Sequence, residues 1–75
     1  MSKQLNMNII GPQVQNIREH FNLTQDQVAA RLNRLGWDIS RGTYAKIECQ
    51  RRRVSDQEAL LLAEALKVGI DELFG

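Results

Sequence analysis

Cationic side chains that could hold a polyanion gather in the middle of this chain. Residues 31–53 contain seven Lys and Arg against two Asp and Glu, a net charge of +5, whereas residues 54–75 carry a net charge of −4. This asymmetry favours one basic face for a polyanion and an acidic side turned away from it. An ordinary solvated surface laced with salt bridges fits the same charges, and charge alone does not separate the two interpretations.

Enzyme chemistry is not indicated by the residue types. The chain has no paired nucleophile and base, no carboxylate pair with supporting residues and no glycine-rich loop that could cradle a phosphate. Its single Cys49 provides neither an internal disulfide nor a pair of metal ligands. We therefore expect no enzymatic activity, no metal and no cofactor.

Length and composition limit the architecture. The 75 residues suffice for one domain with one small core, and 43% hydrophobic with 25% charged residues is typical of a soluble globular protein. No run approaches the roughly 20 apolar residues that span a bilayer, and the first ten residues lack the pattern of a signal peptide. We expect a cytoplasmic protein without membrane contact.

Capping residues divide the chain into short helices. Residues 1–10 show no hydrophobic period and are predicted to form a flexible arm, followed by a folded domain over 11–75. Helix starts are predicted at Gly11-Pro12, Thr24, Ser40 and Ser55. Gly36 predicts a left-handed stop after the second helix, and the segment from Ile70 to Phe74 predicts a last short helix. No strand pattern competes, so the expected fold is all-α, a compact bundle of about five short helices.

The order and spacing of residues across 11–74 form the most specific signal. The pattern is Arg18, Leu23-Thr24-Gln25, Val28-Ala29-x-x-Leu32, Ser40-Arg41-Gly42-Thr43-Tyr44-x-Lys46-Ile47-Glu48 and Ala65-Leu66-x-Val68-x-Ile70-Asp71-x-Leu73. It resembles the phage-repressor and Cro (Xre-like, lambda repressor-like) helix-turn-helix family. The resemblance implies a sequence-specific transcriptional regulator, a repressor, that binds double-stranded DNA as a homodimer with the helix over about 40–49 in the major groove. No small-molecule effector is evident.

The resemblance also assigns base contacts to the start of this recognition helix and to one residue a turn further on: Ser40, Arg41, Gly42, Thr43 and Lys46. Arg41 can donate two hydrogen bonds to guanine O6 and N7, which discriminates against other bases by about 1–3 kcal/mol. Gly42 has no side chain and would let the backbone approach DNA closely. The alternative is that Gly42 only tolerates a tight helix start.

Contacts to the DNA backbone are implied on both sides of the recognition helix. Thr24 and Gln25 open the preceding helix, whose N–H groups and dipole favour a phosphate. Arg51, Arg52 and Arg53 follow the recognition helix, where loop residues of the family grip the sugar-phosphate backbone. A triple-arginine run is otherwise ordinary solvated surface.

One ion pair is implied between two helices. In the family, an arginine at the position of Arg18 pairs with an acidic residue at the position of Glu48. Such a bidentate pair would fix the angle of the recognition helix. The alternative is two free surface charges, which would contribute little to stability.

The connection before the recognition helix is longer than the family's usual three or four residues. We expect the second helix to gain a turn, which would place Arg31 and Arg34 near DNA. Trp37 is expected to pack with Ile39 in the core over this connection, with a partner contact as the alternative. Cys49 is expected to be a buried or half-buried thiol.

A different class of function remains open on the same fold. The chain could be a protein-interaction module, such as an antitoxin-like or anti-repressor partner. Leu60 and Leu61 widen the apolar face of the fourth helix beyond what one core needs, and they would then matter more than the arginines. In a DNA-binding regulator they would be core residues or part of a dimer contact.

Overall fold

A computed structural model describes residues 6–75, which form four α-helices and one 3-10 helix. The elements are α1 (Gly11–His20), α2 (Gln25–Arg34), α3 (Arg41–Glu48), α4 (Asp56–Leu66) and η1 (Ile70–Phe74). No strand occurs between residues 6 and 75. The predicted all-α class is confirmed, except that the last of the expected helices is a 3-10 turn. None of the helices in this part of the chain is long and apolar enough to cross a membrane.

The helix starts follow from their capping residues. Thr24 Oγ1 accepts the Gln27 N–H at 3.1 Å, and the Gln27 side chain accepts the Thr24 N–H at 2.8 Å. The same reciprocal arrangement joins Ser55 and Glu58 at the start of α4. Ser40 caps α3 through its hydroxyl. These bonds satisfy N–H groups that have no partner within the helix, and they confirm the three starts predicted from capping residues.

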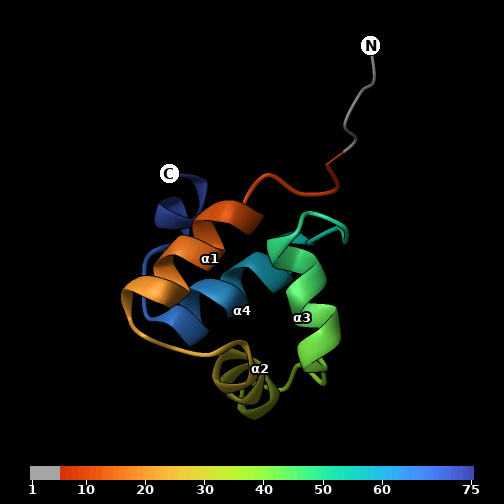
Figure 1. The fold of residues 1–75 in the computed structure, drawn as a ribbon, viewed down its shortest axis with the longest axis vertical. Helices are drawn as coiled ribbons and strands as arrows, with labels where there is room; N and C mark the ends of the chain where they lie inside the picture. Colours follow the sequence, from red (N-terminus) through yellow and green to blue (C-terminus); the bar gives the residue numbers. More distant parts are fainter. Residues whose placement is uncertain (1–5) are drawn as a thin grey trace.

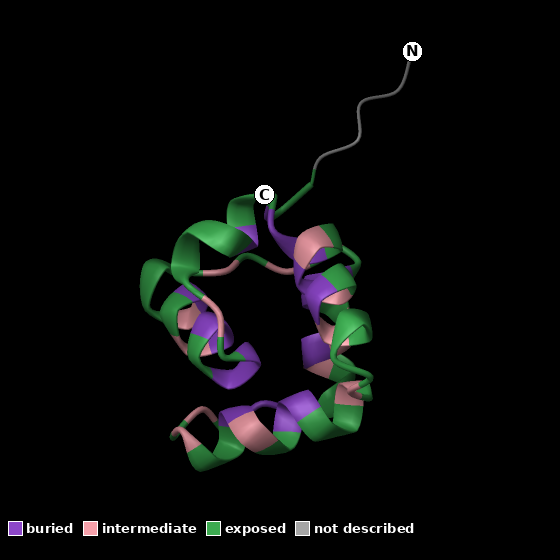
Figure 2. Cartoon of the chain, turned by 90° about the vertical axis from the view of Figure 1, so that its left-hand side faces the viewer, coloured by how far each residue is buried: buried purple, intermediate pink, exposed green. Residues whose placement is uncertain are grey.

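The core lies between the helices and draws on all of them. The largest fully buried side chains are Val14, Val28, Leu32, Tyr44, Ile47, Leu62, Leu66 and Leu73. Figure 2 shows the buried faces of the helices turned toward the middle of the bundle. In Figure 1, α4 lies near the centre of the view, with α1 above it, α3 to its right and α2 below it. α3 packs mainly on α1 and α2, so its other side is open to solvent.

The connection between α2 and α3 comprises residues 35–40 and is held by specific hydrogen bonds. Gly36 has a φ of +101°, which confirms the predicted left-handed stop. The Asn33 side chain donates to the carbonyl oxygens of Trp37 at 2.9 Å and Ile39 at 3.0 Å. Ile39 is buried in the core, as expected, whereas Trp37 packs against the core but is only half-buried. The long connection is therefore a defined part of the fold.

The segment before α1 is attached to the far end of α3. Residues 1–5 of the predicted arm lie outside the described residues, but Asn8 and Ile10 are buried. The Asn8 side-chain amide donates to the carbonyl oxygens of Ile47 at 3.1 Å and Arg52 at 2.8 Å, and its oxygen accepts the Gly11 N–H at 2.7 Å. The end of the predicted arm thus belongs to the packed domain, because one asparagine satisfies three backbone groups there.

Gly11 lets α1 approach α3 end-on. A Cβ built on Gly11 would lie 2.4 Å from the Ile47 carbonyl oxygen and 2.9 Å from that of Glu48. Both neighbours are backbone atoms that cannot move without shifting α3. Only glycine therefore permits this approach, which places the start of α1 against the last carbonyl groups of α3.

Candidate nucleic-acid interface

The helix α3 has one buried and one exposed side. Tyr44, Ile47 and Glu48 are buried, whereas Gly42 and Lys46 are exposed. Gly42 and Lys46 are four residues apart and therefore lie on the same side of the helix, one turn from each other. This outer side of α3 therefore carries the cation of Lys46 and, at Gly42, a backbone position that no side chain covers.

Arg41 lies at the start of α3 and reaches toward α2. Its Nε is 3.5 Å from Asp26 Oδ1, and the two side chains are 58% and 78% exposed. An exposed pair of this kind contributes about 0–1 kcal/mol. Because the interaction is weak and open to solvent, the guanidinium can exchange Asp26 for an external acceptor. Sequence reasoning missed Asp26 as a partner, since only the fold brings the first turns of α2 and α3 together.

Ser40 and Thr43 use their hydroxyl groups within the helix cap. The Ser40 Oγ accepts the Thr43 N–H at 3.1 Å and donates to Thr43 Oγ1 at 3.0 Å. Ser40 is exposed and Thr43 is half-buried. Both sit at the end of α3 that also carries Arg41; the Ser40 hydroxyl donates and accepts within the cap, whereas the Thr43 hydroxyl acts there as an acceptor.

The ion pair between α1 and α3 is present. Arg18 Nε donates to Glu48 Oε2 at 2.7 Å and Nη2 donates to Oε1 at 3.2 Å, which makes a bidentate contact. The side chain of Glu48 is 2% exposed and that of Arg18 is 12% exposed. A third bond runs from Arg18 Nη1 to the Leu23 carbonyl oxygen at 2.8 Å. Neither residue is a free surface charge.

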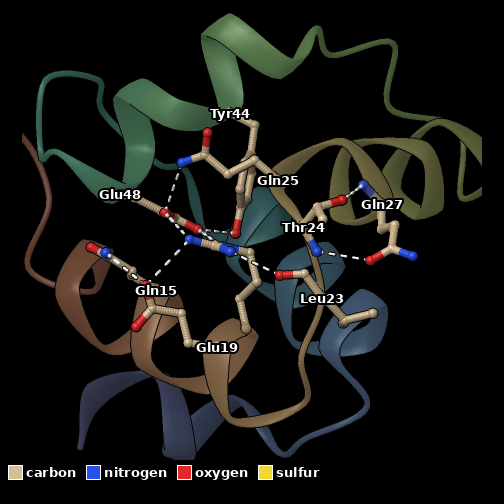
Figure 3. A network of polar contacts seen from close by, with 9 residues as sticks. Gln15, Glu19, Leu23, Thr24, Gln25, Gln27, Tyr44 and Glu48 are labelled. Carbon is tan, nitrogen blue, oxygen red and sulfur yellow. Dashed lines mark hydrogen bonds and ion pairs between the residues drawn. The ribbon is translucent and has the colours of Figure 1, made fainter.

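Glu48 also binds two further side chains, which Figure 3 shows pointing toward its carboxylate. The Tyr44 hydroxyl donates to Oε2, and the Gln25 amide donates to Oε1 at 3.0 Å. Burial alone would raise the pKa of Glu48, but the hydrogen bonds from Arg18, Tyr44 and Gln25 outweigh it and hold that pKa below its usual value. Burial, with the bond to Glu48, raises the pKa of Tyr44. An ionised carboxylate therefore joins α1, α2 and α3.

The start of α2 retains backbone donors for an anion. The Thr24 hydroxyl is used in the cap and the Gln25 amide is used by Glu48. The first N–H groups of the helix have no acceptor within it, and the helix dipole adds positive charge there. What this end of α2 can offer a phosphate is thus its backbone, with Gln25 as the first helical residue.

The three consecutive arginines after α3 differ from one another. Arg51 and Arg53 are exposed. Arg52 is half-buried, and its Nη1 and Nη2 donate to the two Glu58 carboxylate oxygens at 2.9 and 3.1 Å. Its guanidinium also lies 5.4 Å from the centre of the Trp37 ring. The hydrogen bonds to Glu58 raise the pKa of Arg52, and Arg52 in turn lowers that of Glu58.

The expectation that the Cys49 thiol is buried or half-buried is wrong, whereas the expectation that Arg31 and Arg34 lie near DNA stays a prediction. Arg31 Nη1 donates to the Ala65 carbonyl oxygen at 3.0 Å, so it is turned toward the end of α4, whose last carbonyls lack partners within the helix, and not toward the outer side of α3. Arg34 is exposed and, together with Arg31, lines a groove beside the end of α4. Cys49 is exposed, because the chain turns away from the core directly after Glu48.

Comparison with known families agrees with this geometry. A family model described as helix-turn-helix matches residues 14–73, which is most of the chain. Searches of curated proteins and of solved structures gave no match. The match covers most of α1 and all of α2, α3 and α4, including the α2–α3 pair that the sequence pattern singled out. The chain therefore belongs to the Xre and lambda repressor-like helix-turn-helix family of DNA-binding regulators.

Proposed function

We propose that this protein is a sequence-specific transcriptional regulator, a repressor, that places α3 in the major groove of DNA. The observation that carries the proposal is the division of α3 into two sides. Its inner side is fixed through Glu48, while Arg41, Gly42 and Lys46 remain open to solvent. The major groove is about 12 Å wide and admits an α-helix presented in this way.

Base recognition is assigned to the outer side of α3. Arg41 would exchange its weak contact with Asp26 for guanine O6 and N7, and Lys46 would reach a guanine or a phosphate. A Cβ built on Gly42 would meet no atom within 4 Å, so nothing inside the domain requires glycine at this position. That open space favours a role for Gly42 in close approach to DNA. Ser40 could donate to DNA only by giving up its bond to Thr43, whereas Thr43 is the acceptor in that bond and could still donate its own O–H.

Contacts to phosphates would flank this helix. Arg51 and Arg53 are exposed in the loop after α3, and the backbone N–H groups at the start of α2 lie on its other side. These groups carry no sequence information, but they would fix the position of the domain on the duplex. Affinity should therefore depend steeply on salt.

Two copies are proposed to act together. One helix of eight residues reads few base pairs, and a homodimer on half-sites about 34–36 Å apart is the usual solution in proteins of this architecture. A dimer bound in this way would exclude other proteins from the same DNA, which is sufficient for repression.

The direct experiment combines a selection with a salt series. Sequences bound from a random duplex pool should share a motif with two-fold symmetry, and the affinity for that motif should fall steeply between about 50 and 200 mM salt. A pool without enrichment, or binding without a salt slope, would contradict the proposal.

A protein-interaction module is the second candidate, and one observation favours it. Leu60 on α4 is 55% exposed, as an apolar contact residue would be. Leu60→Ser should abolish partner binding if the domain is such a module, and it should leave the binding of one domain to a half-site unchanged if the domain is a DNA-binding regulator. A full-length DNA site compared with a single half-site separates this effect from loss of dimerisation.

A further inference from the structure

Arg52 contacts three segments around α3: its own loop after α3, the helix α4 and the connection before α3. It lies in the loop between α3 and α4, and its guanidinium binds Glu58 of α4 through two hydrogen bonds. Nη1 also donates to the Arg53 carbonyl oxygen at 2.7 Å. One face of the guanidinium lies 5.4 Å from the ring centre of Trp37, which belongs to the connection before α3. A single side chain thus joins the loops on both sides of α3 to α4.

Its partners are themselves held in place. Glu58 Oε1 accepts the Ser55 N–H at 3.0 Å, so the carboxylate is part of the cap of α4. The Trp37 carbonyl oxygen accepts from Asn33 at 2.9 Å, and the indole packs against the core. The Arg52 carbonyl oxygen accepts from Asn8 at 2.8 Å. The arginine therefore connects fixed points and is not simply resting on the surface.

Recognition requires both loops to hold α3 at one angle. α3 packs mainly on α1 and α2, and it receives its connection to α4 through the loop that contains Arg52. A six-residue connection precedes the helix, which is longer than a tight helix-turn-helix turn. Asn33 fixes the path of this connection, and the contact of Trp37 with Arg52 adds a link from it to the loop after α3.

We propose that Arg52 is a positioning residue for the recognition helix, which ties Trp37 to Glu58 and does not bind a DNA phosphate. The inference rests on the proposed function. It departs from the expectation that all three arginines grip the DNA backbone. Arg51 and Arg53 are left with that role, because they are exposed and their side chains make no ion pair within residues 6–75.

The salt dependence of DNA binding separates the two roles. Each phosphate contact that is lost lowers the slope of log K against log salt by about one. Arg51→Gln and Arg53→Gln should each show this reduction on the selected duplex. Arg52→Gln should instead weaken binding about tenfold with the wild-type slope and shift the base preference, because α3 is no longer held at the same angle.

For each of two further variants, a phosphate contact by Arg52 and a positioning role of Arg52 predict opposite results. Glu58→Gln keeps an oxygen for the Ser55 N–H but removes the charge that holds Arg52. If Arg52 bound a phosphate, its release from Glu58 would make the Glu58→Gln variant bind DNA more tightly. If Arg52 is a positioning residue, the Glu58→Gln variant should bind DNA about as weakly as Arg52→Gln. The double variant Arg52→Gln with Glu58→Gln should then bind no more weakly than either single variant. Arg52→Lys should keep most of the wild-type DNA affinity if Arg52 contacts a phosphate. It should bind as weakly as Arg52→Gln if the bidentate contact with Glu58 is needed.

The tryptophan provides a readout without DNA. Trp37 is the single tryptophan of the chain, so its emission reports on the contact with Arg52 in the free protein. Trp37→Phe, which keeps an aromatic face, should retain most of the DNA affinity, whereas Trp37→Leu should lose it.

These experiments distinguish failure of the positioning role of Arg52 from failure of the proposed DNA-binding function. A reduced salt slope for Arg52→Gln, or tighter binding by Glu58→Gln, would overturn the positioning role while leaving the proposed function intact. Absence of salt-dependent DNA binding by the wild-type protein would end the proposed function and this inference together. If the tryptophan emission spectrum of Arg52→Gln is identical to that of the wild type, the contact between Arg52 and Trp37 is not formed in solution.

Discussion

Arg18 and Glu48 are thirty positions apart in the chain and form a bidentate ion pair with bonds of 2.7 and 3.2 Å. The pair joins the last turn of α1 to the last turn of α3, and Tyr44 and Gln25 complete the hydrogen bonds of the same carboxylate. The angle of α3 is therefore set by bonds inside the protein. Because α3 already has this orientation before it meets its target, less conformational freedom is lost on binding, and the entropic cost of binding is lower.

Removing one member of this pair should destabilise the fold strongly. Arg18→Met would leave the Glu48 carboxylate, which is 2% exposed, without its main partner, at a cost of about 3–5 kcal/mol in the free energy of unfolding. Urea unfolding measures the change. Arg18→Met combined with Glu48→Gln is the matched control and should recover much of the loss. A single-variant effect below about 1 kcal/mol would show that the pair is not formed.

The same carboxylate should make stability depend on pH. Because the pKa of Glu48 is lower in the folded than in the unfolded state, its contribution is complete above the unfolded value of about 4.3 and is lost as the pH falls through the folded value. Urea unfolding of the wild type and of Glu48→Gln between about pH 3 and pH 7 should give curves that converge at the acid end. Parallel curves would contradict this assignment. Glu58 remains in both proteins, so its own lowered pKa cancels in the comparison.

The close contact between α1 and α3 predicts a severe effect of one methyl group. Gly11→Ala would place a Cβ 2.4 Å from the Ile47 carbonyl oxygen, and we expect a loss of about 1–3 kcal/mol in unfolding free energy. Alanine is otherwise the better helix former, so a stabilised variant would show that the two helices do not meet end-on.

Gly42→Ala should act in the opposite direction on stability. No atom lies within 4 Å of a Cβ at this position, so we expect the variant to be more stable by about 0.5–1 kcal/mol. Its affinity for DNA should nevertheless fall, because the added methyl group keeps the backbone of α3 from the base edges. Unchanged affinity in a binding assay would remove Gly42 from the interface.

Arg41→Gln should relax the sequence preference at one base pair. The lost pair of hydrogen bonds to guanine corresponds to about 1–3 kcal/mol of discrimination. Competition between the selected duplex and single-base variants measures it. Lys67→Gln is the matched control, since Lys67 is an exposed cation that follows α4 and should leave the preference unchanged. Equal preference in the Arg41 variant and the wild type would exclude Arg41 as a base-reading residue.

Local signals in the sequence were sufficient for most of the fold. Thr24, Ser40 and Ser55 mark helix starts because a cap involves residues only three positions apart, and Gly36 marks a stop because its φ is positive. The pair of Arg18 and Glu48 was expected from the family resemblance. Neither residue alone would have indicated a partner so distant in the chain.

Contacts between distant segments could not be predicted in this way. Asn8 lies in a segment without hydrophobic period, so nothing in the sequence indicates that its amide binds the end of α3. Arg31 and Arg52 look like DNA-binding cations by type and position, yet carbonyl and carboxylate groups of α4 hold them. Such partners depend on how the helices pack, which composition and spacing do not specify.

Cys49 is the single cysteine of the chain, and it is exposed directly after the last residue of α3. A thiol-reactive reagent will therefore modify one defined position, and no other thiol has to be removed first. Attached there, a group that cleaves DNA would cut close to the end of the recognition helix. The positions of the cuts on each strand would then map the direction in which that helix runs along its binding site.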